Sequence, residues 1–95
     1  MILQIIRLKT KLSEDELIKR AKGREPQFKA IPGLVQKYYV KMDDAGRYGG
    51  VYVWDSNESL QTFRESALAK GIPEAYELLE APDIEILDVL FQLRD

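Results

Sequence analysis

The chain has 95 residues and a formal net charge of −2, from 14 basic and 16 acidic side chains. This length fits one domain over residues 1–95, and the balanced charge offers no basic patch for nucleic acid or an anionic membrane. Cysteine and histidine are both absent. Their absence excludes disulfides, thiolate nucleophiles, and thiolate or imidazole ligands for a metal or haem iron, so we expect no metal and no cofactor.

The N-terminal segment 1–10 reads MILQIIRLKT, with apolar residues on both alternating sets. This pattern predicts a strand that is buried on both faces. The apolar run breaks at Gln4 and Arg7 and has no basic leading region, so it does not resemble a signal peptide. No run approaches the roughly 20 apolar residues of a membrane span. We therefore expect a cytoplasmic protein.

A helix is predicted to begin after Ser13, because Ser13 and Glu16 have the spacing of a capping box. Gly23 and Pro26 predict a kink or a short break before a second helical turn that carries Phe28. The Ile-Pro-Gly sequence at 31–33 ends the helical region.

Two strands are predicted over residues 34–42 and 49–54, joined by the turn sequence DDAG at 43–46. In the first strand, Leu34, Gln36, Tyr38 and Val40 form one alternating set, and Val35, Lys37 and Tyr39 belong to the other. The Gly49-Gly50 doublet predicts a bulge or a close approach of another backbone.

A second helix is predicted to begin at an Asp55 or Ser56 cap and to end at the Gly-Ile-Pro sequence 71–73. A short helix could follow over 73–79. The last predicted strand covers residues 84–93, again apolar on both faces, with Asp88 as the acidic exception in the alternating set of Ile84, Ile86 and Leu90.

The predicted order βαββαβ indicates an α+β, ferredoxin-like domain with a four-stranded antiparallel sheet and helices on one face. All four strands carry apolar residues on both faces. Leaving the uncovered face in water would cost on the order of 10 kcal/mol, comparable to the stability of a small domain. The sequence therefore predicts a homodimer that packs sheet face against sheet face.

Several segments together resemble one family: PGL at 32–34 followed by KYY at 37–39, then GGVYVW at 49–54, then a capped helix with Phe63. These segments look like the small monooxygenases of the YdhR type, which are antibiotic biosynthesis monooxygenase-like proteins of the dimeric α+β barrel superfamily. The resemblance implies a barrel formed by two subunits, with a ligand cavity in each subunit between sheet and helices. Relatives oxidise polycyclic aromatic compounds with dioxygen and without metal or flavin. Others degrade haem through a histidine that this chain lacks.

Candidate ligand-binding residues are the aromatic and basic side chains of the two central strands and the second helix: Lys37, Tyr38, Tyr39, Tyr52, Trp54, Phe63 and Arg64. The aromatic residues could form a wall for a flat substrate, or they could pack the core and the interface. Lys37 and Arg64 could stabilise an anionic substrate, or they could be solvated surface cations. Asp88 could be a buried base or an ion-pair partner. No residue pattern identifies a catalytic base.

RNA-recognition domains share the βαββαβ order and carry stacking aromatic residues on the third strand. Here Gly49 and Val51 stand where such a domain needs aromatic residues, so we expect no nucleic-acid partner. The favoured function is cofactor-independent monooxygenation of a small apolar or aromatic substrate in a cavity between sheet and helices. The alternative is a non-catalytic small-ligand-binding or structural homodimer of the same fold.

Overall fold

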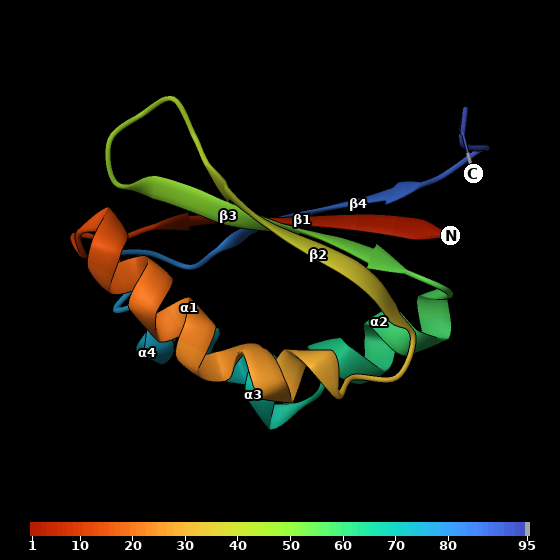
Figure 1. Ribbon diagram of the computed structural model, residues 1–95, viewed down its shortest axis with the longest axis horizontal. Coiled ribbons are helices and arrows are strands. Elements are labelled where there is room, and N and C mark those ends of the chain that lie inside the picture. Colours follow the sequence, from red (N-terminus) through yellow and green to blue (C-terminus); the bar gives the residue numbers. More distant parts are fainter. Residues whose placement is uncertain (95) are drawn as a thin grey trace.

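Four strands form one sheet in the spatial order β2-β3-β1-β4, with every neighbouring pair antiparallel. The structure is a computed structural model that describes residues 1–94. The strands are β1 (Ile2–Lys9), β2 (Leu34–Lys41), β3 (Arg47–Trp54) and β4 (Asp83–Asp88), and the helices are α1 (Glu14–Lys29), α2 (Asn57–Arg64), α3 (Ala67–Lys70) and α4 (Ile72–Ala75). All four helices lie on the same side of the sheet (Figure 1). The predicted ferredoxin-like fold is thereby confirmed.

Strand register divides the side chains between a covered face, which packs on the helices, and an open face. On β1 the even-numbered residues Ile2 to Leu8 are buried, and the register places them opposite Trp54, Tyr52, Gly50 and Tyr48 of β3. The open face carries the alternate residues: Leu3, Ile5, Gln36, Tyr38, Val40, Val51, Val53 and Leu87. Both faces are therefore largely apolar, as the sequence predicted, and the helices of this chain cover only one.

The core between the sheet and the helices is an aromatic cluster of Phe28, Tyr52, Trp54 and Phe63. Tyr52 and Trp54 stack with an interplanar angle of 3° and ring centroids 6.1 Å apart. Phe63 lies 5.5 Å from the Tyr52 ring and 5.3 Å from the Trp54 ring, between centroids. Trp54 has no exposed surface. These rings fill the middle of the layer between the sheet and the helices.

Helix α1 runs unbroken from Glu14 to Lys29, so the predicted break is wrong, whereas a kink at Pro26 stays a prediction. Pro26 is exposed and so is Lys22, whose carbonyl loses its helical partner to the proline. Water can satisfy that carbonyl, which explains why the helix tolerates Pro26. The predicted cap is confirmed, since the Ser13 side chain accepts a hydrogen bond from the Glu16 N–H at 3.2 Å.

Strand β2 contains a register shift between Leu34 and Gln36, which leaves Val35 as the extra residue of a bulge. The shift pairs Leu34 with Trp54 and turns Gln36, Tyr38 and Val40 to the open face. The sequence placed Leu34 in the same alternating set as those residues, and the bulge separates it from them.

The pairing of β3 is continuous through Gly49 and Gly50, so the predicted irregularity there is a close approach. A Cβ on Gly49 would lie 2.5 Å from the Ile6 carbonyl oxygen.

The last strand is shorter than predicted, because β4 ends at Asp88 rather than at residue 93. Asp88 pairs with Ile2, where β1 begins, so later residues have no strand to pair with. One further backbone hydrogen bond extends the pairing of β4 with the N-terminal segment: the Val89 N–H donates to the Met1 carbonyl at 3.0 Å. Residues 89–94, here called the tail, rise on the side of the sheet opposite the helices (Figure 1). Their apolar side chains Leu90, Phe91 and Leu93 are 91%, 81% and 82% exposed.

Candidate functional site

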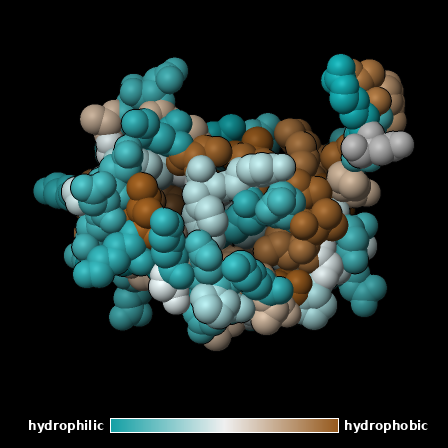
Figure 2. Space-filling model, in the orientation of Figure 1, coloured by the Kyte–Doolittle hydropathy of each residue, from teal (hydrophilic) through white to brown (hydrophobic). Residues whose placement is uncertain are grey.

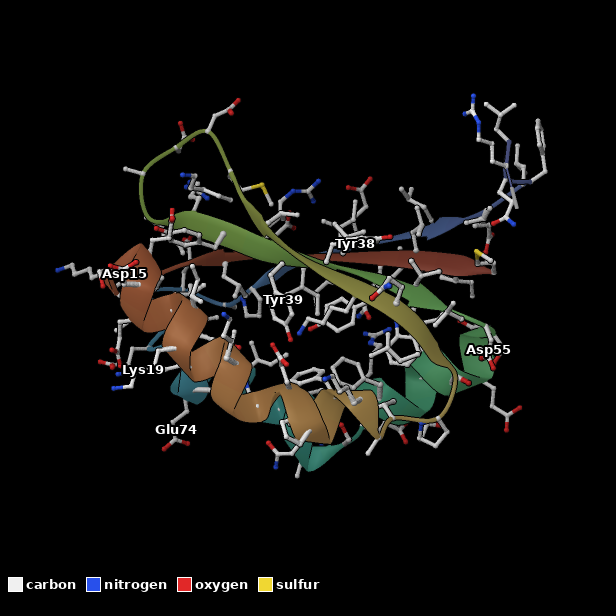
Figure 3. The ribbon with its side chains drawn as sticks, viewed as in Figure 1. Asp15, Lys19, Tyr38, Tyr39, Asp55 and Glu74 are labelled. Carbon is white, nitrogen blue, oxygen red and sulfur yellow. The ribbon has the colours of Figure 1, made fainter. Side chains whose placement is uncertain are left out.

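The structure places the seven predicted site residues in four environments. Lys37 and Tyr39 lie at the α1–β2 flank of the layer, and Tyr52, Trp54 and Phe63 form the aromatic cluster. Arg64 is on the exposed surface of α2 at the other flank. Tyr38 and Tyr39 leave β2 on opposite sides, with Tyr38 on the open face and 56% exposed (Figure 3). A single wall of all four strand aromatics therefore does not form.

The most buried polar side chain of the core is Gln4, which is 1% exposed. The Trp54 indole Nε1–H donates to Gln4 Oε1 at 2.9 Å. An indole N–H can only donate, so it fixes the amide with its oxygen toward Trp54. The amide Nε2 has two hydrogens to donate, and the bond from Trp54 is the side-chain hydrogen bond that joins Gln4 to another residue in 1–94. Gln4 is thus a pre-oriented donor held by a fully buried tryptophan.

A pocket of about 230 Å³, here called the Gln4 pocket, opens beside this amide. It lies between β1 and β4 on one side and α2 to α4 on the other. Its lining is Gln4, Ile6, Phe63, Arg64, Ala69, Lys70, Ile72, Pro82 and Ile84. The charged members are two cations, Arg64 and Lys70, and neither forms an ion pair with another described residue. An apolar pocket with one buried amide donor and two cations at its rim suits a flat ligand that carries an oxygen anion.

The opposite flank holds a groove of about 420 Å³ between α1 and β2, here called the Lys37 groove. Its lining is Glu25, Phe28, Lys29, Leu34, Val35, Gln36, Lys37 and Tyr39. The Lys37 Nζ lies 3.7 Å from the Phe28 ring centroid, 4.3 Å from that of Tyr39 and 4.5 Å from that of Tyr52. Three ring faces therefore surround one ammonium group.

Burial, and secondly the positive charge of Arg24, lower the pKa of Lys37 to about 7. Burial likewise raises the pKa of the Tyr52 and Tyr39 phenols, so both stay protonated at neutral pH. Arg24 itself lies over the Phe28 and Tyr76 rings, 5.5 Å from each centroid, and its Nη2 donates to the Leu68 carbonyl at 3.1 Å. Its Nη1 is buried without a partner in the described chain.

The two flanks are separated by a nearly filled interior. A cavity of about 20 Å³ remains beneath Lys37 and Tyr52, enough for about one water molecule. The structure thus has two side openings, while the ligand cavity that the resemblance implies between sheet and helices stays a prediction.

The largest groove, about 590 Å³, lies between the end of α1 and α2. Its only charged lining residue is Glu58, so it offers no cation for an anionic ligand. Asp88, which the sequence suggested as a buried base or an ion-pair partner, lies exposed at the end of β4.

Gln4 is the functional candidate that sequence reasoning missed. The available signal was its position: it shares the alternating set of Ile2 and Ile6, so a polar residue there faces the core. Within residues 1–94, no group of three or more acidic side chains is placed to hold a metal ion. None of the helices in that range is both long and apolar enough to cross a membrane.

No protein-family model and no curated protein sequence matches the chain. Among solved structures, SnoaB from Streptomyces nogalater, described as a cofactor-independent oxygenase, matches with TM-score 0.77 and 14% identity, over 99% of this chain and 97% of that one. A structure described as an antibiotic biosynthesis monooxygenase matches with TM-score 0.74 and 13% identity, over 95% and 99% of the two chains. A variant of MhuD with two manganese protoporphyrin IX molecules bound per active site matches with TM-score 0.76 and 16% identity, over 100% of each chain.

These identities are low, so the similarity shows the fold. The chain has the α+β fold of the antibiotic biosynthesis monooxygenases, which confirms the resemblance at that level. The YdhR type within it stays a prediction.

Proposed function

From this shared fold, we propose that the protein is a homodimeric, cofactor-independent monooxygenase that acts on a small aromatic substrate in the Gln4 pocket. The observation that carries the proposal is the Gln4–Trp54 hydrogen bond, which presents an amide donor to an apolar pocket. The description of SnoaB as a cofactor-independent oxygenase supports the reaction class.

The proposed reaction needs only the substrate and dioxygen. A hydroxyanthrone-like phenol, written RH₂ at its reacting carbon, loses a proton to solvent water, and the resulting anion gives one electron to O₂. The substrate radical and superoxide then combine to a peroxide anion, which takes a proton back from solvent, loses water and leaves a ketone. The balance is RH₂ + O₂ → R=O + H₂O, so the substrate itself supplies all four electrons that reduce O₂.

The protein would accelerate this reaction by stabilising the substrate anion. The Gln4 amide donates to the oxygen on which the negative charge gathers, and Arg64 and Lys70 add positive potential at the rim. Phe63, Ile6 and Ile72 provide the apolar surface that holds the rings and excludes water. A fixed donor of this kind is typically worth about 10²–10³-fold in rate.

The homodimer is proposed from the open face of the sheet. Leu87 on that face is 42% exposed and Tyr38 is 56% exposed, and nothing within residues 1–94 covers them. The tail projects on the same side with its apolar residues (Figure 2), where it would meet a second copy. A standard interface buries roughly 800 Å² per partner, and a four-stranded sheet face together with this tail is an apolar surface suited to such an interface.

A second candidate function is ligand binding without turnover. The observation that favours it is the lining of the Gln4 pocket, which contains no Asp, Glu or Tyr to act as a base. Under this alternative the amide and the two cations would hold an anionic aromatic ligand in the same place.

The test measures oxygen consumption with a panel of hydroxyanthrone-like phenols, together with ligand binding by calorimetry. The oxygenase predicts consumption of one O₂ per ketone formed, and a loss of about 10²-fold in Gln4→Leu. The matched control is Gln61→Leu, on the exposed surface of α2. Binding without oxygen consumption contradicts the oxygenase and supports the binding protein. Absence of both supports a structural role.

A further inference from the structure

Lys37 occupies a position that the proposed oxygenase does not use. It lies on β2 opposite Tyr52 and points toward the helices, on the flank away from the Gln4 pocket. Its Nζ makes no ion pair or hydrogen bond with residues 1–94. Glu25, the one acid in the groove lining, instead approaches Lys29 at 3.7 Å.

The neighbouring lysines show how different this environment is. Lys41, on the same strand and the same face, is mostly exposed and lies 3.1 Å from the Glu14 carboxylate. Lys29 is also mostly exposed. Lys37 is the one whose amine lies over three aromatic rings without a carboxylate partner.

The backbone is shaped to admit the Lys37 side chain. Gly50 lies beneath it, and a Cβ there would approach Lys37 Cε to 3.2 Å and Tyr52 Cε1 to 2.9 Å. The missing side chain at Gly50 therefore creates the space through which the lysine reaches the rings.

Two opposing effects act on the amine in this place. The ring faces attract a cation, whereas burial and the nearby Arg24 guanidinium oppose one and lower the pKa of Lys37. A lysine desolvated in an apolar site beside a second cation is the arrangement that makes an amine nucleophilic at neutral pH.

We propose that Lys37 is a covalent binding site for a carbonyl compound, an aldehyde or ketone with a flat apolar body, which it holds as an imine in the Lys37 groove. The neutral amine attacks the carbonyl carbon, a C–N bond forms, and the oxygen takes the electron pair and a proton. The resulting carbinolamine loses water and leaves the C=N bond. The balance is R₂C=O + Lys-NH₂ → R₂C=N-Lys + H₂O, with no oxidant or reductant.

The groove suits both parts of such a ligand. Phe28, Leu34 and Val35 give an apolar surface for its body, in a space of about 420 Å³ that falls within the range of small-molecule sites. When the imine is protonated, its positive charge lies over the same three rings that face the ammonium. The rings thus stabilise the product of the reaction as well as the free amine.

The test uses the full-length protein with a limiting amount of benzaldehyde at pH 7 and sodium borohydride to trap the imine. Borohydride delivers hydride to the imine carbon and leaves a stable benzyl group on the lysine. At this pH an amine of pKa about 7 is neutral about a thousandfold more often than an ordinary lysine. Peptide mapping of the wild type is therefore expected to find the benzyl group on Lys37 at least about tenfold more than on any other lysine.

Two variants complete the test. Lys37→Arg keeps the cation, removes the nucleophile and should lose the preferred adduct, whereas Lys41→Arg should keep it. Adduct spread evenly over the lysines of the wild type would overturn the proposal, and so would labelling of Lys37 no faster than Lys41. The wild-type map decides even if Lys37→Arg fails to fold.

The imine-trapping test can be interpreted separately from the test of the proposed oxygenase, because the Lys37 groove and the Gln4 pocket lie on opposite flanks. Loss of oxygen consumption in Gln4→Leu says nothing of imine formation. A Lys37 adduct that forms normally in Gln4→Leu would show directly that the two sites act independently.

Discussion

The two faces of the sheet carry similar residues in different surroundings. On the covered face Tyr52 and Trp54 are 2% and 0% exposed, whereas on the open face Tyr38 and Leu87 are 56% and 42% exposed. Both sets come from strands with aromatic and aliphatic residues in alternation. Strand composition alone therefore does not tell whether a sheet face is covered within the chain. The helices packed against one face decide which set of side chains forms the core.

The largest expected effect is on the covered face. Trp54→Ala should lower the free energy of unfolding by about 3–5 kcal/mol, because it empties a fully buried site and leaves the Gln4 amide oxygen unpaired. Trp54→Phe, which keeps most of the volume and loses only the donor, should cost about 1–3 kcal/mol. Urea denaturation of the two variants measures both. Equal losses in the two would mean that packing around the indole contributes little.

On the open face, the corresponding change is expected to act on assembly. Val51 pairs with Ile5 and Tyr38 at the centre of this face, so Val51→Lys would place an unpaired charge inside the proposed interface. The expected cost is about 3–5 kcal/mol in dimerisation, a weakening of at least about a hundredfold. Light scattering after size exclusion measures it. The exposed-helix variant Lys22→Glu should leave the mass unchanged, and a Val51→Lys protein of wild-type mass would count against this interface.

A smaller, pH-dependent effect is expected at Lys37, on the covered face. The folded chain holds the pKa of Lys37 at about 7, below its value of roughly 10.4 in an unfolded chain. Between these values the unfolded state binds a proton that the folded state does not, so stability rises with pH. The rise should be about 2 kcal/mol between pH 7 and pH 9 and should vanish in Lys37→Met.

Urea denaturation midpoints of the wild type and of Lys37→Met, measured from pH 7 to pH 9, test this prediction. The raised pKa values of Tyr39 and Tyr52 act in the opposite direction only where unfolded phenols ionise, near pH 10 and above. An identical pH profile for the wild type and Lys37→Met would show that the ring faces hold the amine charged.

The smallest effect concerns Arg7, whose guanidinium lies on the open face 3.0 Å from Glu85 and 3.4 Å from Asp83. In a lone subunit these exposed pairs should be worth less than about 1 kcal/mol. Arg7→Gln should therefore cost little in the Val51→Lys background. In the wild-type background it should cost more, because a covered face would hold two carboxylates without their cation. Equal costs in the two backgrounds would indicate that the open face stays in water.

Much of the fold followed from local patterns. Ser13 and Glu16 marked the start of α1, the 43–46 turn joined two strands, and apolar residues on both alternating sets indicated two apolar faces. The failures came from long-range partners. β4 ends where β1 offers no further pairing, and Pro26 fits within α1 because Lys22 faces water. The local sequence around β4 does not show where β1 begins, and the local sequence around Pro26 does not show that Lys22 is exposed.

The candidate site was less predictable than the fold. Tyr38 and Tyr39 were grouped as one wall, although neighbouring residues of a strand face opposite ways. The Val35 bulge moved Leu34 away from its alternating set, which no sequence pattern announced. Gln4 was overlooked because one polar residue in an apolar strand carries no motif. Its role emerges only when Trp54, fifty residues later, is placed beside it.

The most direct measurement of the central claim, that the open face is a subunit interface, is sedimentation equilibrium of the wild-type protein from nanomolar to micromolar concentration. The account predicts the mass of two subunits at micromolar concentration, with dissociation on dilution. A well-folded species that keeps the single-chain mass of 10.9 kDa throughout would contradict it.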